Sequence, residues 1–461
     1  MYVDKKRPVL PENKMGIMPV GKLLFTMTLP LAISMLVQAL YNVVDSIYVS
    51  RVSESAVTAL SLAFPIQNLQ IGCSTGIAVG VNALLSKSLG EGNREQANYA
   101  AGNGILLSLI MVAAFMLFGF LGATPYYAMQ SDVEETVTGG ASYTAICCIF
   151  TLGIFVEILG ERLLQASGRT VYTLFTQGSG AVVNILLDPL FIFGGLGIPA
   201  MGIAGAAVAT VIGQWVAAIM AVIFNLKCNP DVKFSFRFLR PKKNVMSKIL
   251  TVGVPSMIMM AIGSIMNFFM NQIFLSFKNY GETAAGVFGI YFKLQSFFLM
   301  PIFGLNNASV SIIAFNYGAR QPKRIVKALK LAVGAAFVFL TLGLVVFQTL
   351  PDLLLGIFEP SEDFLSIGRS ALRIVSIHFP LAAAAITLGA SFQALGNGTY
   401  STITSLCRQL IVLVPSAYLL SLTGNVHAVW WSFPIAEVVS LALTLLFFLR
   451  IYRQKIKPLF S

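Results

Sequence analysis

Long apolar runs recur along the whole sequence, and they leave few folds open to it. Of the 461 residues, 56% are hydrophobic and only 11% are charged, whereas soluble domains carry about 25% charged residues. An apolar run of roughly 20 residues can cross a lipid bilayer as a helix. The runs centre near Met35, Gly72, Ser108, Phe150, Asn184, Val211, Met260, Leu299, Val338, Ala384, Val412 and Leu441. Because backbone groups in lipid must bond within their own segment, the sequence predicts an all-α, polytopic membrane protein with twelve transmembrane helices.

Basic residues collect in alternate loops between these runs. The net charge is +12, and most of the 31 Lys and Arg fall in loops and tails on the same side as the N-terminus. The richest loop carries Lys233, Arg237, Arg240, Lys242 and Lys243, whereas segments 132–135 and 352–363 on the other side are acidic. Positive loops face the cytoplasm, so both termini are predicted to be cytoplasmic. The basic residues therefore reflect the orientation of the helices in the membrane, and they do not indicate a nucleic-acid partner.

The two halves of the chain repeat one another at a fixed spacing of 228 residues. The matched pairs are Gln67 with Gln295, Gly90 with Gly318, Gly168 with Gly396, and Tyr172 with Tyr400. A repeat of this length indicates an internal duplication, and a unit of six spans makes the two copies parallel. The sequence therefore predicts two pseudo-symmetric six-helix lobes, residues 1–226 and 249–461, joined by a basic cytoplasmic linker, residues 227–248.

Few ionisable residues interrupt the apolar runs, and they are candidates for function because a charge in lipid is costly. They are Asp45, Glu157 and Asp188 in the N-terminal half, and Lys293, Arg408, Glu437 and His378 in the C-terminal half. Glu157 has Glu161 and Arg162 close by, so we interpret it as a structural ion-pair partner.

Two carboxylates and their neighbours form the strongest candidate site. Gln38, Asn42 and Asp45 follow one another at helical spacing and share one face. Asn184 and Asp188 are one turn apart, and the proline that follows frees a backbone carbonyl beside them. Two acids, an amide and a free carbonyl suit a hard cation or a proton. The alternative is that Asp45 lies near the end of its helix and is only hydrated among the lipid headgroups.

The C-terminal half lacks the matching carboxylates. Met270 and Ser416 stand where the duplication places them. Glu437 can balance one of the two cations, Lys293 and Arg408, so a partly compensated charge cluster is expected. This cluster fits either a structural ion pair or a group that responds to substrate charge.

Five short motifs occur in order along nearly the whole chain. They are Thr28-Leu29-Pro30, Val44-Asp45-Ser46, Asn184 to Asp188-Pro189, Gly205-Ala206-Ala207-Val208-Ala209-Thr210, and Phe315-Asn316-Tyr317-Gly318-Ala319. Together they resemble the multidrug and toxic compound extrusion (MATE) family in its bacterial branch. The eukaryotic and some bacterial branches of that family place a Glu on the seventh helix. This chain has none there, so the resemblance does not imply a cation site in the C-terminal lobe.

The resemblance implies a secondary active exporter of cationic or amphipathic organic compounds, driven by Na⁺ or H⁺ antiport through alternating access. It implies a cation site formed by Asp45, Asn184, Asp188 and Thr210, and it places Gln38 and Tyr143 where residues line the cavity. The further residues that we predict in the substrate cavity are Asn42, Gln67, Lys293, Gln295, Arg408 and Glu437. No cofactor or metal is expected besides the transported Na⁺ or H⁺. The protein is predicted to be a monomer in the bacterial inner membrane that takes small organic substrates.

Other functions fit less well. A lipid-linked oligosaccharide flippase, or a related lipid flippase of the same superfamily, remains the alternative. A major-facilitator carrier would have a basic Gly-Arg signature where this chain reads Lys87-Ser-Leu-Gly-Glu-Gly-Asn-Arg94. An enzyme is not expected, because the two histidines, His378 and His427, lack a metal-like partner at helical spacing. No P-loop for ATP is present. The sequence leaves open the substrate and the choice between Na⁺ and H⁺.

Overall fold

Helices dominate the protein. The structure, a computed structural model, describes residues 13–195, 197–278, 280–356, 358 and 361–460, and the side chains of residues 42, 43, 46, 47, 50, 54 and 57 lie outside the description. The described residues contain no β-strand. Within these residues, ten helices are long and apolar enough to cross a membrane, and two bent helix pairs bring the number to twelve. The predicted set of twelve spans in two lobes is confirmed.

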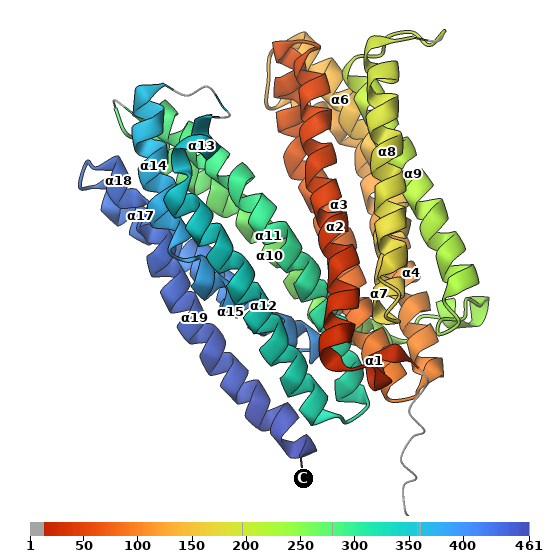
Figure 1. Cartoon of the computed structure of the whole chain (residues 1–461). Coiled ribbons are helices and arrows are strands. Elements are labelled where there is room, and N and C mark those ends of the chain that lie inside the picture. Colours follow the sequence, from red (N-terminus) through yellow and green to blue (C-terminus); the bar gives the residue numbers. More distant parts are fainter. Residues whose placement is uncertain (1–12, 196, 279, 357, 359–360, 461) are drawn as a thin grey trace, which may run out of the picture.

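The N-terminal lobe contains the first six spans (Figure 1). Its helices are α1 (Lys14–Ile17), α2 (Val20–Ser50), α3 (Glu54–Gly90), α4 (Arg94–Leu121), α5 (Ala123–Ala128), α6 (Glu134–Ile149), α7 (Leu152–Ala166), α8 (Val171–Phe193) and α9 (Ile203–Cys228). The short helix η1 (Phe236–Leu239) lies in the segment before the next lobe. Helix α9 ends at Cys228 and helix α10 begins at Lys243. The linker boundaries proposed from the sequence, residues 227 and 248, stay a prediction.

The C-terminal lobe repeats this arrangement in the second bundle of Figure 1. Its helices are α10 (Lys243–Leu275), α11 (Gly281–Gly318), α12 (Pro322–Thr349), α13 (Pro351–Gly356), α14 (Glu362–Ser376), α15 (Phe379–Ala394), α16 (Gly398–Leu406), η2 (Cys407–Leu413), α17 (Val414–Ser421), α18 (Val426–Val429), α19 (Ser432–Ile451), η3 (Tyr452–Ile456) and η4 (Lys457–Leu459). The eleventh span runs through α16, η2 and α17, and the last span runs from Val426 to Leu459.

The duplication is visible in where the spans bend. The fourth span is broken between α6 and α7 with a bend of 47°, and the tenth between α14 and α15 with a bend of 49°. The residues at these breaks, Phe150 and His378, are 228 positions apart, the spacing of the sequence repeat. Each lobe therefore keeps the same kinked element at the same place.

Glycines let the two lobes pack backbone to backbone. Helix α2 packs against α11, and α3 packs against both α10 and α11. A Cβ atom on Gly304 of α11 would lie 2.7 Å from the backbone nitrogen of Ala32, and one on Gly76 of α3 would lie 2.7 Å from the carbonyl oxygen of Gly253. Such distances are well below van der Waals contact. Gly76 and Gly304 are themselves duplicates, so the same close contact occurs twice, once on each side of the interface.

The short helix α1 joins the two lobes at one end of the molecule. The Nη2 of Arg324, in the C-terminal lobe, donates to the carbonyl oxygens of Met15 (2.9 Å) and Met18 (2.7 Å). On the other side, Asn13 Nδ2 donates to the carbonyl oxygen of Ser167 at 3.2 Å, in the N-terminal lobe. Figure 1 shows the two bundles meeting near α1 and diverging toward the opposite end, where α6 and α14 lie. The lobes are therefore held together at the α1 end.

Candidate functional site

Helices α8 and α9 hold the centre of the N-terminal candidate site. A Cβ atom on Gly213 of α9 would lie 2.8 Å from the carbonyl oxygen of Gly180 in α8, so the glycines allow close packing of the two backbones. This contact lies next to Asn184, whose Nδ2 donates to Thr210 Oγ1 at 3.4 Å and to Asp188 Oδ1 at 3.2 Å. The structure thus brings together three of the four residues predicted to bind the cation.

Several oxygens of this site lack a hydrogen-bond partner. Asp188 is fully buried and Asn184 is 3% exposed. The buried atoms Asp188 Oδ2, Asn184 Oδ1 and Asp45 Oδ1 have no partner in the part of the chain that the structure describes. A buried polar atom left without a partner costs free energy. These oxygens are therefore suited to accept a cation or, on the carboxylates, a proton.

Tyr41 and Glu157 extend the acidic site, and the sequence analysis did not assign either to it. The hydroxyl of Tyr41, on α2, lies within electrostatic range of the carboxylates of Glu157, Asp45 and Asp188. The predicted ion pair of Glu157 is wrong, because no basic group of the described chain lies within 4.0 Å of its carboxylate. Acids from three helices, α2, α7 and α8, thus act electrostatically on one tyrosine.

The residues next to Glu157 along α7 are bonded within the lobe. Glu161 accepts from Thr176 Oγ1 at 2.6 Å and from Gln177 Nε2 at 3.0 Å. Arg162 donates to Gln165 Oε1 at 3.0 Å. The carboxylate of Glu161 therefore accepts from neutral groups of α8, and Arg162 donates to a neutral amide, so neither supplies the ion-pair partner that was predicted for Glu157.

Of the predicted cavity residues in this lobe, two are bonded to each other. Gln67 Nε2 donates to the hydroxyl of Tyr143 at 2.8 Å, and this tyrosine is 1% exposed. Gln38 is half-buried on α2. The side chain of Asn42 lies outside the described residues. The role of all four in binding a substrate stays a prediction.

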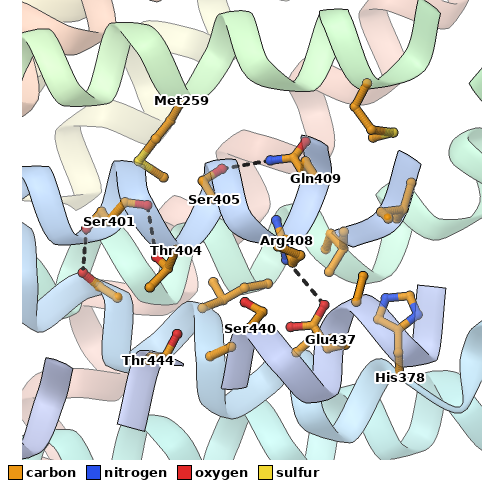
Figure 2. Close-up of a pocket in the computed structure, with 18 of the residues that line it drawn as sticks. Met259, His378, Ser401, Thr404, Ser405, Arg408, Gln409, Glu437, Ser440 and Thr444 are labelled. Atoms are coloured by element: carbon orange, nitrogen blue, oxygen red, sulfur yellow. Dashed lines mark hydrogen bonds and ion pairs between the residues drawn. The ribbon is translucent and has the colours of Figure 1, made fainter. Parts of the chain in front are cut away.

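A cavity of about 230 Å³ lies within the C-terminal lobe. Gln295, Arg408 and Glu437, all three predicted to line a substrate cavity, line it. Figure 2 shows Arg408 and Glu437 facing each other, with Arg408 Nη1 donating to Glu437 Oε2 at 3.5 Å. Lys293 is exposed on α11 and does not line this cavity. The predicted charge cluster therefore reduces to one ion pair.

Replacing Glu437 by Gln should destabilise the protein. The carboxylate is 3% exposed, and breaking a buried pair costs about 3–5 kcal/mol. Because the Arg408 side chain is 30% exposed and the contact is long, we expect roughly 1–3 kcal/mol. Thermal unfolding in detergent measures this, with Glu95→Gln as control, since its pair with Arg237 is exposed and worth under about 1 kcal/mol. Equal melting temperatures for Glu437→Gln and the wild type would show that the pair does not stabilise the fold.

Comparisons with known proteins agree with this architecture. The profile of the family described as MatE matches residues 30–190 and 255–419, one segment in each lobe. A relative named multidrug export protein MepA, from Staphylococcus aureus, is 24% identical over 426 residues, 91% of each chain. An FAD transporter from Shewanella oneidensis is also 24% identical, over 91% of this chain and 92% of the relative. A solved structure titled as the outward-facing conformation of a multidrug resistance MATE family transporter superposes with a TM-score of 0.88, at 24% identity, over 100% of this chain and 99% of that one.

Proposed function

The chain belongs to the MatE family of transporters, and from this we propose that it is a secondary active multidrug exporter that exchanges organic compounds for Na⁺ or H⁺. The relative named as a multidrug export protein supports the substrate class. The lipid-flippase alternative is no longer favoured, because relatives that match along 91% of the chain are named as carriers of drugs and of FAD.

The observation that carries the proposal is the set of partnerless oxygens on Asp45, Asn184 and Asp188. Asp188 is fully buried and Asp45 is partly buried inside the lobe, where carboxylate charge without a cation is costly. A sodium ion would be shared by these oxygens, and a proton would neutralise one of the acids. In both cases the bound cation offsets the cost of the buried carboxylate charge and links α2 to α8.

The arrangement of the lobes supports the alternating access that we propose. The lobes meet at the α1 end and diverge at the other end (Figure 1), and the basic loops favour a cytoplasmic location for the α1 end. In this state the end at which the lobes diverge faces the outside of the cell. Rocking of the lobes would open the α1 end instead. Pro30 lies inside α2, where it removes one backbone hydrogen bond, so α2 can bend when a cation binds between it and α8.

The same proposal places the protein in the bacterial plasma membrane as a monomer, with both termini cytoplasmic. Each lobe supplies one polar region, the acid cluster in the N-terminal lobe and the cavity around Arg408 in the C-terminal lobe. A drug and the coupling cation therefore need not share ligands. Each can act by stabilising one of the two lobe arrangements through its differential affinity.

Equilibrium binding tests this two-site version. We expect the apparent dissociation constant of a fluorescent organic cation to rise with Na⁺ concentration, or with falling pH, and then to level off, because conformational coupling has a finite free energy. The measurement is fluorescence anisotropy with the purified protein in detergent. If the apparent dissociation constant rises without limit, drug and cation compete for the same acids. If it does not change with Na⁺ or pH, the two sites are not coupled.

A further inference from the structure

The cavity in the C-terminal lobe contains an ion pair that is only partly satisfied. Glu437 Oε1 is buried without a partner in the described chain, and Oε2 has one contact, at 3.5 Å from Arg408 Nη1. A well-made Arg–carboxylate pair has two contacts of about 2.7–2.9 Å. A guanidinium carries five N–H donors, and within the described residues Arg408 uses one of them. Both partners of the pair therefore have bonding capacity left.

Arg408 lies in a π-helical segment that borders this cavity. The segment Cys407–Leu413 is π-helical, and Pro415 follows it inside the same span. A proline cannot donate to the carbonyl four residues earlier, and its ring clashes with that carbonyl, which favours a wider turn. As a result, the adjacent residues Arg408 and Gln409 both line the cavity. Figure 2 shows Gln409 held by Ser405, with a hydrogen bond of 2.7 Å, while Arg408 points at Glu437.

The rest of the lining suits the body of a small organic molecule. All described lining residues belong to the C-terminal lobe. Apolar side chains such as Met266, Phe292 and Phe433 alternate there with four amides, Gln295, Asn306, Gln393 and Gln409. His378 is the third titratable group of the lining. Its Nδ1 donates to the carbonyl oxygen of Val375 at 2.6 Å, so this nitrogen is not available to a ligand.

The charges of the pair decide which ligand fits. A purely cationic ligand would meet the guanidinium of Arg408, and a purely anionic ligand would meet the carboxylate of Glu437. A ligand with both charges can direct its acidic group to the free N–H donors of Arg408 and its ammonium group to Glu437 Oε1. We infer that this cavity binds zwitterionic compounds, with an acid and an amine on a compact apolar body, through Arg408 and Glu437. The inference rests on the proposed export function, for which it supplies a substrate class.

Three probes with the same body and different charge test this inference. Phenylalanine is a zwitterion, its methyl ester is a cation, and N-acetylphenylalanine is an anion. Their binding to the protein in detergent is measured by equilibrium dialysis without any gradient. We expect phenylalanine to bind about tenfold more tightly than either derivative, the factor that one added charge-assisted hydrogen bond provides.

Substitutions in the pair should change the preferred charge. Arg408→Gln leaves the carboxylate alone, so the methyl ester should become the best ligand. Glu437→Gln leaves the guanidinium alone, so N-acetylphenylalanine should become the best ligand. The double variant, Arg408→Gln with Glu437→Gln, leaves no unpaired charge and remains informative if a single variant does not fold. It should bind all three probes with similar, weak affinity.

The affinities of the three probes test the binding site in the C-terminal lobe independently of transport. A preference that follows the charge of the variant supports the inference, since a purely structural ion pair would not change which probe binds best. The same order of affinity in the wild type and every variant, or an absence of binding to the wild type, would overturn it. Because no gradient is involved, a failure of antiport would appear in flux measurements and leave these affinities unaffected.

Discussion

The variant Asp188→Asn is expected to lose gradient-driven efflux completely, down to the rate of liposomes without protein. The amide has the size of the carboxylate, but it can neither accept a proton nor supply a negative charge to Na⁺. Asp188 is fully buried and keeps a partnerless Oδ2, so solvent does not replace the lost ligand. Asp45→Asn should behave in the same way, because Asp45 supplies the second partnerless carboxylate oxygen.

A matched control comes from the duplication. Ser416 stands 228 residues after Asp188, and in the described part of the chain its hydroxyl donates only to the carbonyl oxygen of Leu413, at 3.0 Å. Ser416→Ala should therefore transport like the wild type. Size-exclusion chromatography and thermal unfolding establish that all variants are folded. Wild-type efflux in either Asp variant would place the coupling outside the N-terminal lobe.

The variant Gly90→Ala should shift the lobes from the state closed at the α1 end to the state open there. A Cβ atom on Gly90 would overlap the carbonyl oxygen of Phe315, and one on the duplicate Gly318 would overlap that of Lys87. The overlap involves backbone on both sides of the α3–α11 crossing, so no side chain can move to relieve it. The lobes can avoid it by separating at this end, and a protein held in one state cannot complete a transport cycle.

Distances between spin labels measure this shift. Met129 of the N-terminal lobe and Leu353 of the C-terminal lobe are 86% and 66% exposed, and they lie away from the α1 end. With labels there, in a background without the five native cysteines, Gly90→Ala and Gly318→Ala should both shorten the mean distance. Gly334→Ala is the control, because a Cβ atom at Gly334 meets nothing within 4 Å. Unchanged distances in both variants would show that this crossing does not set the lobe arrangement.

Local spacing in the sequence predicted those parts of the site that lie on one helix or follow from charge balance. Asn184 contacts Asp188 because they are one helical turn apart. Arg408 pairs with Glu437 because Glu437 is the acid that lies within the apolar runs of that half. The place of Lys293 could not be predicted in this way, since charge alone does not show which face of a long helix a residue occupies.

The missed features depend on how helices cross or bend. Tyr41 is one turn before Asp45, so its position on the same face was visible in the sequence. What could not be read was that α7 brings Glu157 to it, because the bend after Phe150 sets the direction of α7. Helix α1 was missed for another reason. It is four residues long and is held largely through backbone carbonyl oxygens, which leave no pattern in the residue types.

Transport by the purified protein, with the two possible driving gradients imposed separately, tests the central claim most directly. Liposomes containing the protein and a fluorescent organic cation would be given an inward Na⁺ gradient at equal pH, or an inward H⁺ gradient at equal Na⁺. The account predicts that at least one gradient accelerates efflux in the wild type, and that Asp188→Asn removes this acceleration. Efflux that is the same with either gradient and with none would contradict antiport as the function of this chain.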